Sequence, residues 1–175
     1  MKKQFHWNKW TRKTHYWGAL IILIPISVVL VTGILLQLKK EVDWIQPPTA
    51  KGEISNNPNI SFDNILAAAQ SASEAGIESW DDVDRLDVRI EEGIVKVRGK
   101  NRWEVQIDTR SGDVLQVAYR RSDLIEKLHD GSWFHDKAKL WLFLPSGIIL
   151  FILWITGVYM VLLPYTKKWK RRKKS

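Results

Sequence analysis

Two long apolar runs without a single charged residue set the limits on how this chain folds. They cover residues 16–38 and 140–165. An α-helix rises about 1.5 Å per residue, so each run is long enough to cross a hydrocarbon layer roughly 30 Å thick. We therefore expect two transmembrane helices, at residues 16–40 and 140–165.

The distribution of charge around these runs predicts how the chain crosses the membrane. All 19 acidic residues lie between the runs, whereas the flanks, residues 1–15 and 166–175, are basic and contain no acid. Short flanks rich in Lys and Arg remain in the cytoplasm. We expect both termini to be cytoplasmic and residues 41–138 extracytoplasmic, in the plasma (inner) membrane of a bacterium. The net charge of +8 comes from these tails and indicates contact with membrane lipid rather than with nucleic acid.

Two further features limit the class of protein. The first run is longer than the apolar core of a signal peptide and is followed by Lys39 and Lys40 instead of a small-residue cleavage site, which indicates a retained anchor. The chain has no cysteine, which excludes disulfides, zinc–thiolate sites and cysteine-ligated iron–sulfur clusters. Any redox centre must therefore use histidine or a bound organic cofactor.

The segment between the runs is predicted to hold one small α+β domain. Residues 41–60 form a polar linker, residues 61–128 the domain, and residues 129–139 the entry into the second span. Ser61 is expected to cap a helix over about residues 62–74, with Gly76 as its stop. Alternating apolar and polar residues then predict three antiparallel strands, at residues 86–90, 94–98 and 103–107. A turn at residues 109–113 leads into a further run, 114–117, so the predicted meander has three or four strands before a helix that starts near Ser122.

Three segments resemble the PepSY-associated transmembrane family. Residues 12–18 (RKTHYWG) are similar to the start of its first helix, and residues 128–131 (LHDG) to the start of its second. Residues 102–115 are similar to its PepSY segment, which is a strand, an Asp-x-x-x-Gly turn and a second strand. The resemblance implies a PepSY-like domain and haem-b-type electron transfer, as in siderophore-iron reductases of the inner membrane. It also implies that His15 and His129 are candidate axial ligands of haem iron.

The positions of the histidines add a physical argument. A six-coordinate haem needs axial ligands on both faces, and helix bundles provide them from facing helices, with small residues beside the macrocycle. In an antiparallel pair, His15 should lie level with Thr156-Gly157, and His129 level with Thr32-Gly33. The two histidines come from opposite ends and cannot ligate one haem. We therefore expect a homodimer that forms a four-helix bundle, with a haem b held between the copies at each level.

The remaining candidates rank lower. His135 follows His129 by six residues, or about 240° around a helix, so only one of them is expected to face a bundle, and His135 is the reserve ligand. His6 is the least favoured histidine. The expected partners of haem propionates are Arg12 and Lys13 at one end and Arg120, Arg121 and Lys127 at the other.

Two functions of different class follow from these features. The first is an integral membrane haem-b protein that passes electrons across the membrane, for ferric-iron or siderophore reduction, from an unidentified donor inside to an unidentified acceptor outside. It would be a ferric-reductase-like oxidoreductase or an electron-transfer subunit, and no catalytic side chain is assigned. The second is a haem-free membrane module whose PepSY-like domain binds or regulates a partner protein. A Soret band in the purified protein would separate the two.

Overall fold

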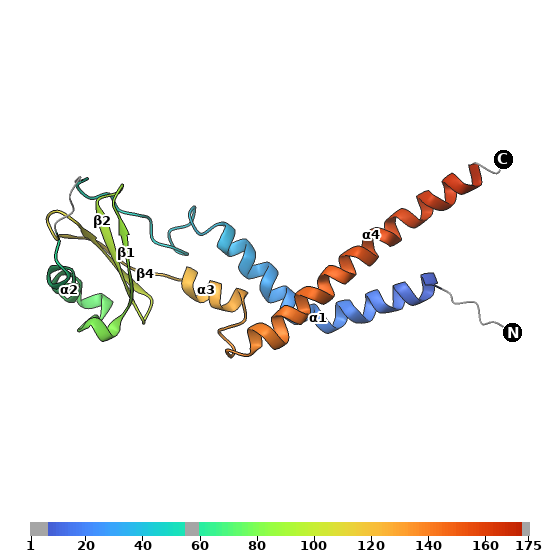
Figure 1. Ribbon diagram of the computed structural model, residues 1–175, viewed down its shortest axis with the longest axis horizontal. Coiled ribbons are helices and arrows are strands. Elements are labelled where there is room, and N and C mark those ends of the chain that lie inside the picture. The colour runs from blue at the N-terminus through green and yellow to red at the C-terminus, as the bar shows by residue number, and fades with distance from the viewer. Residues whose placement is uncertain (1–6, 55–59, 173–175) are drawn as a thin grey trace. The chain divides into compact units, whose positions relative to one another are not determined.

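The computed structural model describes residues 7–54 and 60–172, and the chain divides into two units. One unit joins Met1–Gly33 with Lys127–Ser175, and the other is Ile34–Glu126. The first contains the long apolar helices, and the second contains a β-sheet (Figure 1). Each unit is described separately below.

The helical unit is built on α1, Trp7–Gln37, and α4, Leu144–Arg172, which is preceded by the π-helical turn η3, Lys139–Phe143. Segments long and apolar enough to cross a membrane cover Lys9–Gln37 and Lys139–Tyr165, with mean hydropathies of 2.9 and 2.3. Most of their side chains are exposed. Such helices suit a lipid environment. Their exposed apolar side chains can contact lipid, and their backbone N–H and C=O groups are hydrogen-bonded within the helix.

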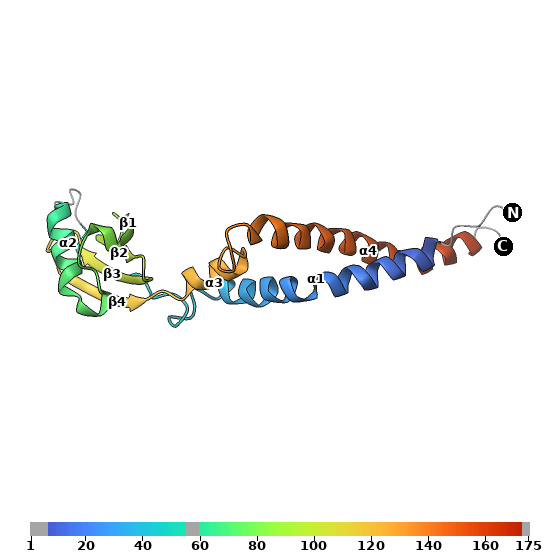
Figure 2. The same ribbon diagram turned by 90° about the horizontal axis from the view of Figure 1, so that it is seen from below.

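The two long helices run antiparallel and approach each other near Gly18. A Cβ atom at Gly18 would lie 3.0 Å from Leu153 Cδ2, so the glycine permits the close approach. Figure 1 shows the two helices crossing, and Figure 2 shows them alongside each other. Pro25 lies inside α1, which changes direction partway along its length (Figure 1), as an interior proline causes.

The second unit contains a four-stranded antiparallel sheet in the order β1-β2-β3-β4. The strands are β1 Val83–Arg89, β2 Ile94–Gly99, β3 Trp103–Asp108 and β4 Val114–Tyr119. The predicted meander is confirmed, and β1 begins three residues earlier than expected because its pairing with β2 shifts register between Val83 and Arg85. Gly93 and Gly112 have φ angles of 68° and 80° in the turns after β1 and β3, where a residue without Cβ is favoured.

Helix α2, Phe62–Ser71, covers one face of this sheet (Figure 2). Ser61 caps it by accepting a bond from Asn64 N–H at 3.2 Å, as expected. The helix ends earlier than predicted, and a 3₁₀ turn, η1 (Ser73–Ala75), connects it to Gly76 in the left-handed conformation. The apolar core between α2 and the sheet is formed by Ile65, Ala69, Ala72, Ala75, Ile77, Val95, Val97, Val105 and Ile107.

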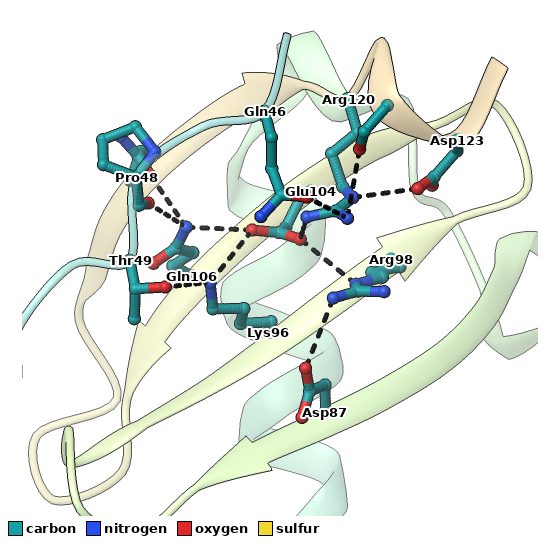
Figure 3. Close-up of polar contacts among 12 residues, drawn as sticks. Gln46, Pro48, Thr49, Asp87, Lys96, Arg98, Glu104, Gln106, Arg120 and Asp123 are labelled. Atoms are coloured by element: carbon teal, nitrogen blue, oxygen red, sulfur yellow. Dashed lines mark hydrogen bonds and ion pairs between the residues drawn. The ribbon is translucent and has the colours of Figure 1, made fainter. Parts of the chain in front are cut away.

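The other face of the sheet is also covered, which the alternating pattern did not predict. Glu104, Gln106 and Lys96 point away from the apolar core and are nonetheless at most 2% exposed. A strap formed by residues 45–53 lies over them, and Pro48 O, Thr49 Oγ1 and Ala50 N–H bond to their side chains. Figure 3 shows this polar cluster between the strap, the sheet and the start of α3, Ser122–His129.

Candidate functional site

His15 on α1 contacts α4 at Thr156. It is in the third turn of α1, and its Nδ1 lies 3.1 Å from the hydroxyl oxygen of Thr156 on α4. The Thr156 hydroxyl also donates to Leu153 O at 2.9 Å within its own helix. The expected level of His15 with Thr156-Gly157 is therefore found within one chain.

His129 makes the matching contact at the other end. It is the last residue of α3, and its Nδ1 lies 3.0 Å from the hydroxyl oxygen of Thr32 on α1. Thr32 is buried, and its hydroxyl lies 2.6 Å from Val28 O and 3.2 Å from Val29 O. His129 is thus placed opposite a position 17 residues after His15, or about 26 Å along α1.

The glycines that follow the two threonines make room for the rings. A Cβ at Gly157 would lie 3.7 Å from His15 Cε1, and one at Gly33 would lie 3.3 Å from His129 Cε1. The first distance is an ordinary contact, whereas the second would displace the ring by a few tenths of an ångström. Each Thr-Gly pair therefore gives one histidine a bonding partner and a flat surface.

An apolar groove of about 630 Å³ opens between α1 and α4 beside His15. A second groove, of about 450 Å³, lies at the same ring and includes Arg12. The first is lined by apolar side chains of both helices, among them Ile22, Leu30, Leu153 and Trp154. Both grooves are open on one side. A flat organic ligand placed there would meet an imidazole, apolar walls and a guanidinium at the rim.

The segment after His129 is held by a tight turn. Gly131 has a φ angle of 82°, and its N–H donates to Leu128 O at 3.3 Å, which ends α3 directly after the histidine. Burial raises the pKa of Asp130, but hydrogen bonds from Ser132 and Lys139 outweigh it and hold the pKa at about 2. Asp130 therefore stays ionised next to His129 in the sequence.

The other sequence candidates are placed differently. His135 is exposed, and its Nδ1 accepts the Lys137 N–H at 3.0 Å. His6 lies outside the described residues. Arg120 is not available to a propionate, because its guanidinium bonds Glu104, Asp123, Ser122 and Gln46 inside the polar cluster. Arg121 donates to Trp44 O at 3.1 Å and lies over its ring.

The hydroxyls of Thr32 and Thr156 were missed as bonding partners in the sequence, where both residues were read as small residues that leave space. The signal was present, because each threonine lies level with a histidine once the helices are antiparallel. Within residues 7–54 and 60–172, no group of three or more His, Asp or Glu side chains is arranged to hold a metal ion.

Comparisons with known proteins agree with the arrangement of the chain. The family model described as the PepSY-associated TM region matches residues 12–175. The comparisons with curated proteins and with solved structures gave no match. The matched range includes both histidine–threonine pairs and the whole sheet.

Proposed function

Because the chain belongs to the PepSY-associated transmembrane family, we propose that it is a haem-b protein of the bacterial plasma membrane that passes electrons across the membrane. The observation that supports this most is the pair of partly buried contacts between a histidine and a threonine, one at each end of two apolar helices. A transmembrane electron carrier needs a redox group near both surfaces. Polar residues inside membrane helices are costly and therefore tend to be functional.

The residues at the His15 end fit a haem. Imidazole nitrogen is a common axial ligand, and a ring bonded through Nδ1 leaves Nε2 for another partner. The groove beside His15, about 630 Å³, is within the range of about 300–1,000 Å³ that is usual for ligand pockets. Arg12 at the rim of the smaller groove is suited to a propionate, because guanidinium pairs well with carboxylate.

A second copy of the chain would complete both sites. Each level of one chain provides a single histidine, and the grooves are open on one side. A two-fold dimer would bring a second His15 to one level and a second His129 to the other, and would close the grooves with apolar helix surface. Haem, when bound, supplies one-electron redox chemistry. The protein would offer His15 and His129 to the iron, exclude water with its apolar helix surfaces and pair a propionate with Arg12.

The direction of transfer follows from the proposed topology. With both basic tails cytoplasmic, His15 is at the inner end and His129 at the outer end. One electron from a separate cytoplasmic donor would then leave on the outer side and reduce one ferric ion, free or in a siderophore, to ferrous. Because His129 lies beside Thr32, the distance along α1 between the levels of His15 and His129 is about 26 Å. A helix from His15 to Lys39 would be about 36 Å long.

The proposal is tested by haem content in the purified full-length protein. We expect a Soret band that shifts on reduction with dithionite. His15→Ala and His129→Ala should each keep about half of the haem per chain, and the double variant almost none, because each change removes an axial ligand from a different site. His6→Ala and His135→Ala are the controls and should keep all of it.

Three results would contradict all or part of the proposal. A folded, colourless protein from cells supplied with haem would leave the haem-free interaction module as the function. Full haem content in both single variants would mean that these histidines are not ligands. Loss of all haem in one single variant would replace the two sites with one.

A further inference from the structure

The hydroxyl protons of Thr32 and Thr156 are already used within their own helices. A threonine hydroxyl has one proton to donate and two lone pairs to accept with. Thr32 is 2.6 Å from Val28 O, and Thr156 is 2.9 Å from Leu153 O. Carbonyl oxygens can only accept, so each hydroxyl donates to its carbonyl.

The direction of the two histidine contacts follows from this. Each threonine oxygen can then only accept from the histidine nitrogen that lies 3.0 or 3.1 Å away. That nitrogen is Nδ1 in both rings, so Nδ1 carries the hydrogen. In a neutral imidazole the other nitrogen, Nε2, then holds a free lone pair.

We infer that Thr32 and Thr156 are positioning residues that hold His129 and His15 in the Nδ1–H tautomer, with the Nε2 lone pair directed away from the hydroxyl toward a ligand. Neither threonine touches the bound group. Each acts through its histidine, as hydrogen-bond partners of metal-bound histidines do when they fix the tautomer and raise the basicity of the ring.

His135 provides the opposite case in the same chain. Its Nδ1 accepts the backbone N–H of Lys137 at 3.0 Å, so Nδ1 is unprotonated and Nε2 carries the hydrogen. Its lone pair is occupied by the turn. This difference in tautomer separates His129 from His135 as the ligand at that end, which their spacing in the sequence left open.

The first experiment needs no haem. Ring-nitrogen NMR on the haem-free full-length chain in detergent, with ¹⁵N-labelled histidine, distinguishes the tautomers at about pH 9, where an ordinary imidazole is neutral. We expect Nδ1–H for His15 and His129 and Nε2–H for His135, with each signal assigned by loss in the single alanine variant. An Nε2–H tautomer at His15 or His129 would overturn the inference at that site.

Variants show whether the hydroxyl is the cause. Thr156→Val keeps the shape of the side chain and removes the acceptor, so His15 should lose its preference for Nδ1–H while His129 keeps it. Thr32→Val should do the reverse, and Thr156→Ser and Thr32→Ser should restore the preference. Ser146→Ala is the matched control, because Ser146 is also buried and donates to Leu142 O at 2.7 Å in α4. A tautomer that stays unchanged in both valine variants would contradict the inference.

The second experiment rests on the proposed function and uses the haem-loaded protein. Loss of the acceptor makes the ring a weaker electron donor, so each valine variant should raise the reduction potential of one haem and leave the other unchanged. Serine should return the potential to its original value. If the protein binds no haem, the proposed function fails while the tautomer result stands. If haem binds and neither potential moves, the positioning role fails while the proposed function stands.

Discussion

At the residue scale, Glu104 is a buried carboxylate in contact with three cationic side chains of the sheet unit. Its side chain is fully buried and lies 2.9 Å from Arg120, 3.2 Å from Arg98 and 3.6 Å from Lys96 (Figure 3). Burial lowers the pKa of Lys96, and the nearby Glu104 carboxylate counteracts that shift. Glu104 thus contacts three cations at the centre of the cluster, and Asp87 and Asp123 pair with Arg98 and Arg120 at its edge.

Glu104→Gln should therefore destabilise the sheet unit strongly. The change removes the Glu104 carboxylate from Lys96 and leaves Arg98 and Arg120 with Asp87 and Asp123 as their carboxylate partners. Breaking a buried pair in this way costs about 3–5 kcal/mol. In pulse proteolysis of the full-length protein, the variant should lose protection at a clearly lower urea concentration than the original protein. Glu53→Gln is the control, because the Glu53–Arg110 pair is exposed and contributes less than about 1 kcal/mol. Equal midpoints for the two variants would contradict the assignment.

At the element scale, the turn that ends α3 depends on Gly131. Its φ angle of 82° disfavours any residue with a Cβ, and a Cβ there would collide with the Phe143 ring. The same turn directly follows His129. A change at this glycine therefore acts on the backbone and on the position of the histidine.

Gly131→Ala should destabilise the helical unit by about 1–3 kcal/mol, from overpacking and an unfavourable φ. Thermal unfolding in detergent measures this, and haem content should fall at the His129 site alone. The matched control is Gly147→Ala in α4, where an added Cβ meets nothing within 4 Å. That variant should be as stable as the original protein or slightly more so, since alanine favours helix. A neutral Gly131→Ala would mean that the turn is not constrained.

The elements could be predicted as far as local pattern determines them. Alternation predicted the first three strands, a turn signal pointed to the fourth, and the absence of charge predicted the two spans. The start of α1 at Trp7 was not predicted. The helix already includes Lys9, Arg12 and Lys13, which precede the apolar run in the sequence. The burial of Glu104 and Gln106 was not predicted either, because it depends on the strap, and no local pattern shows which face a distant segment covers. The depth of each histidine relative to a Thr-Gly pair could be predicted from antiparallel helices. Its hydrogen bond with the threonine hydroxyl could not, because that bond depends on how each helix is rotated about its axis.

At the scale of the whole molecule, the topology is the prediction on which the direction of transfer depends. The chain has no cysteine, so single cysteines can be introduced at exposed positions without background. Lys51→Cys should react with a membrane-impermeant maleimide in spheroplasts, and Lys9→Cys only after permeabilisation, because basic flanks stay inside. The reverse pattern would invert the proposed direction.

The order of residues along the two limbs has one more consequence. In both limbs, which are the two halves of the helical unit, a histidine comes first and a Thr-Gly pair later. His15 precedes Thr32-Gly33 in α1, and His129 in α3 precedes Thr156-Gly157 in α4. Because the limbs are antiparallel, an approximate two-fold rotation exchanges the two ends and places like donor atoms on like donor atoms. If haem is bound at both ends as proposed, its ligands alone would then give neither end a higher affinity for an electron. Any downhill slope has to come from the unlike charges nearby, with Arg12 at one end and the ionised Asp130 and its Lys139 partner at the other.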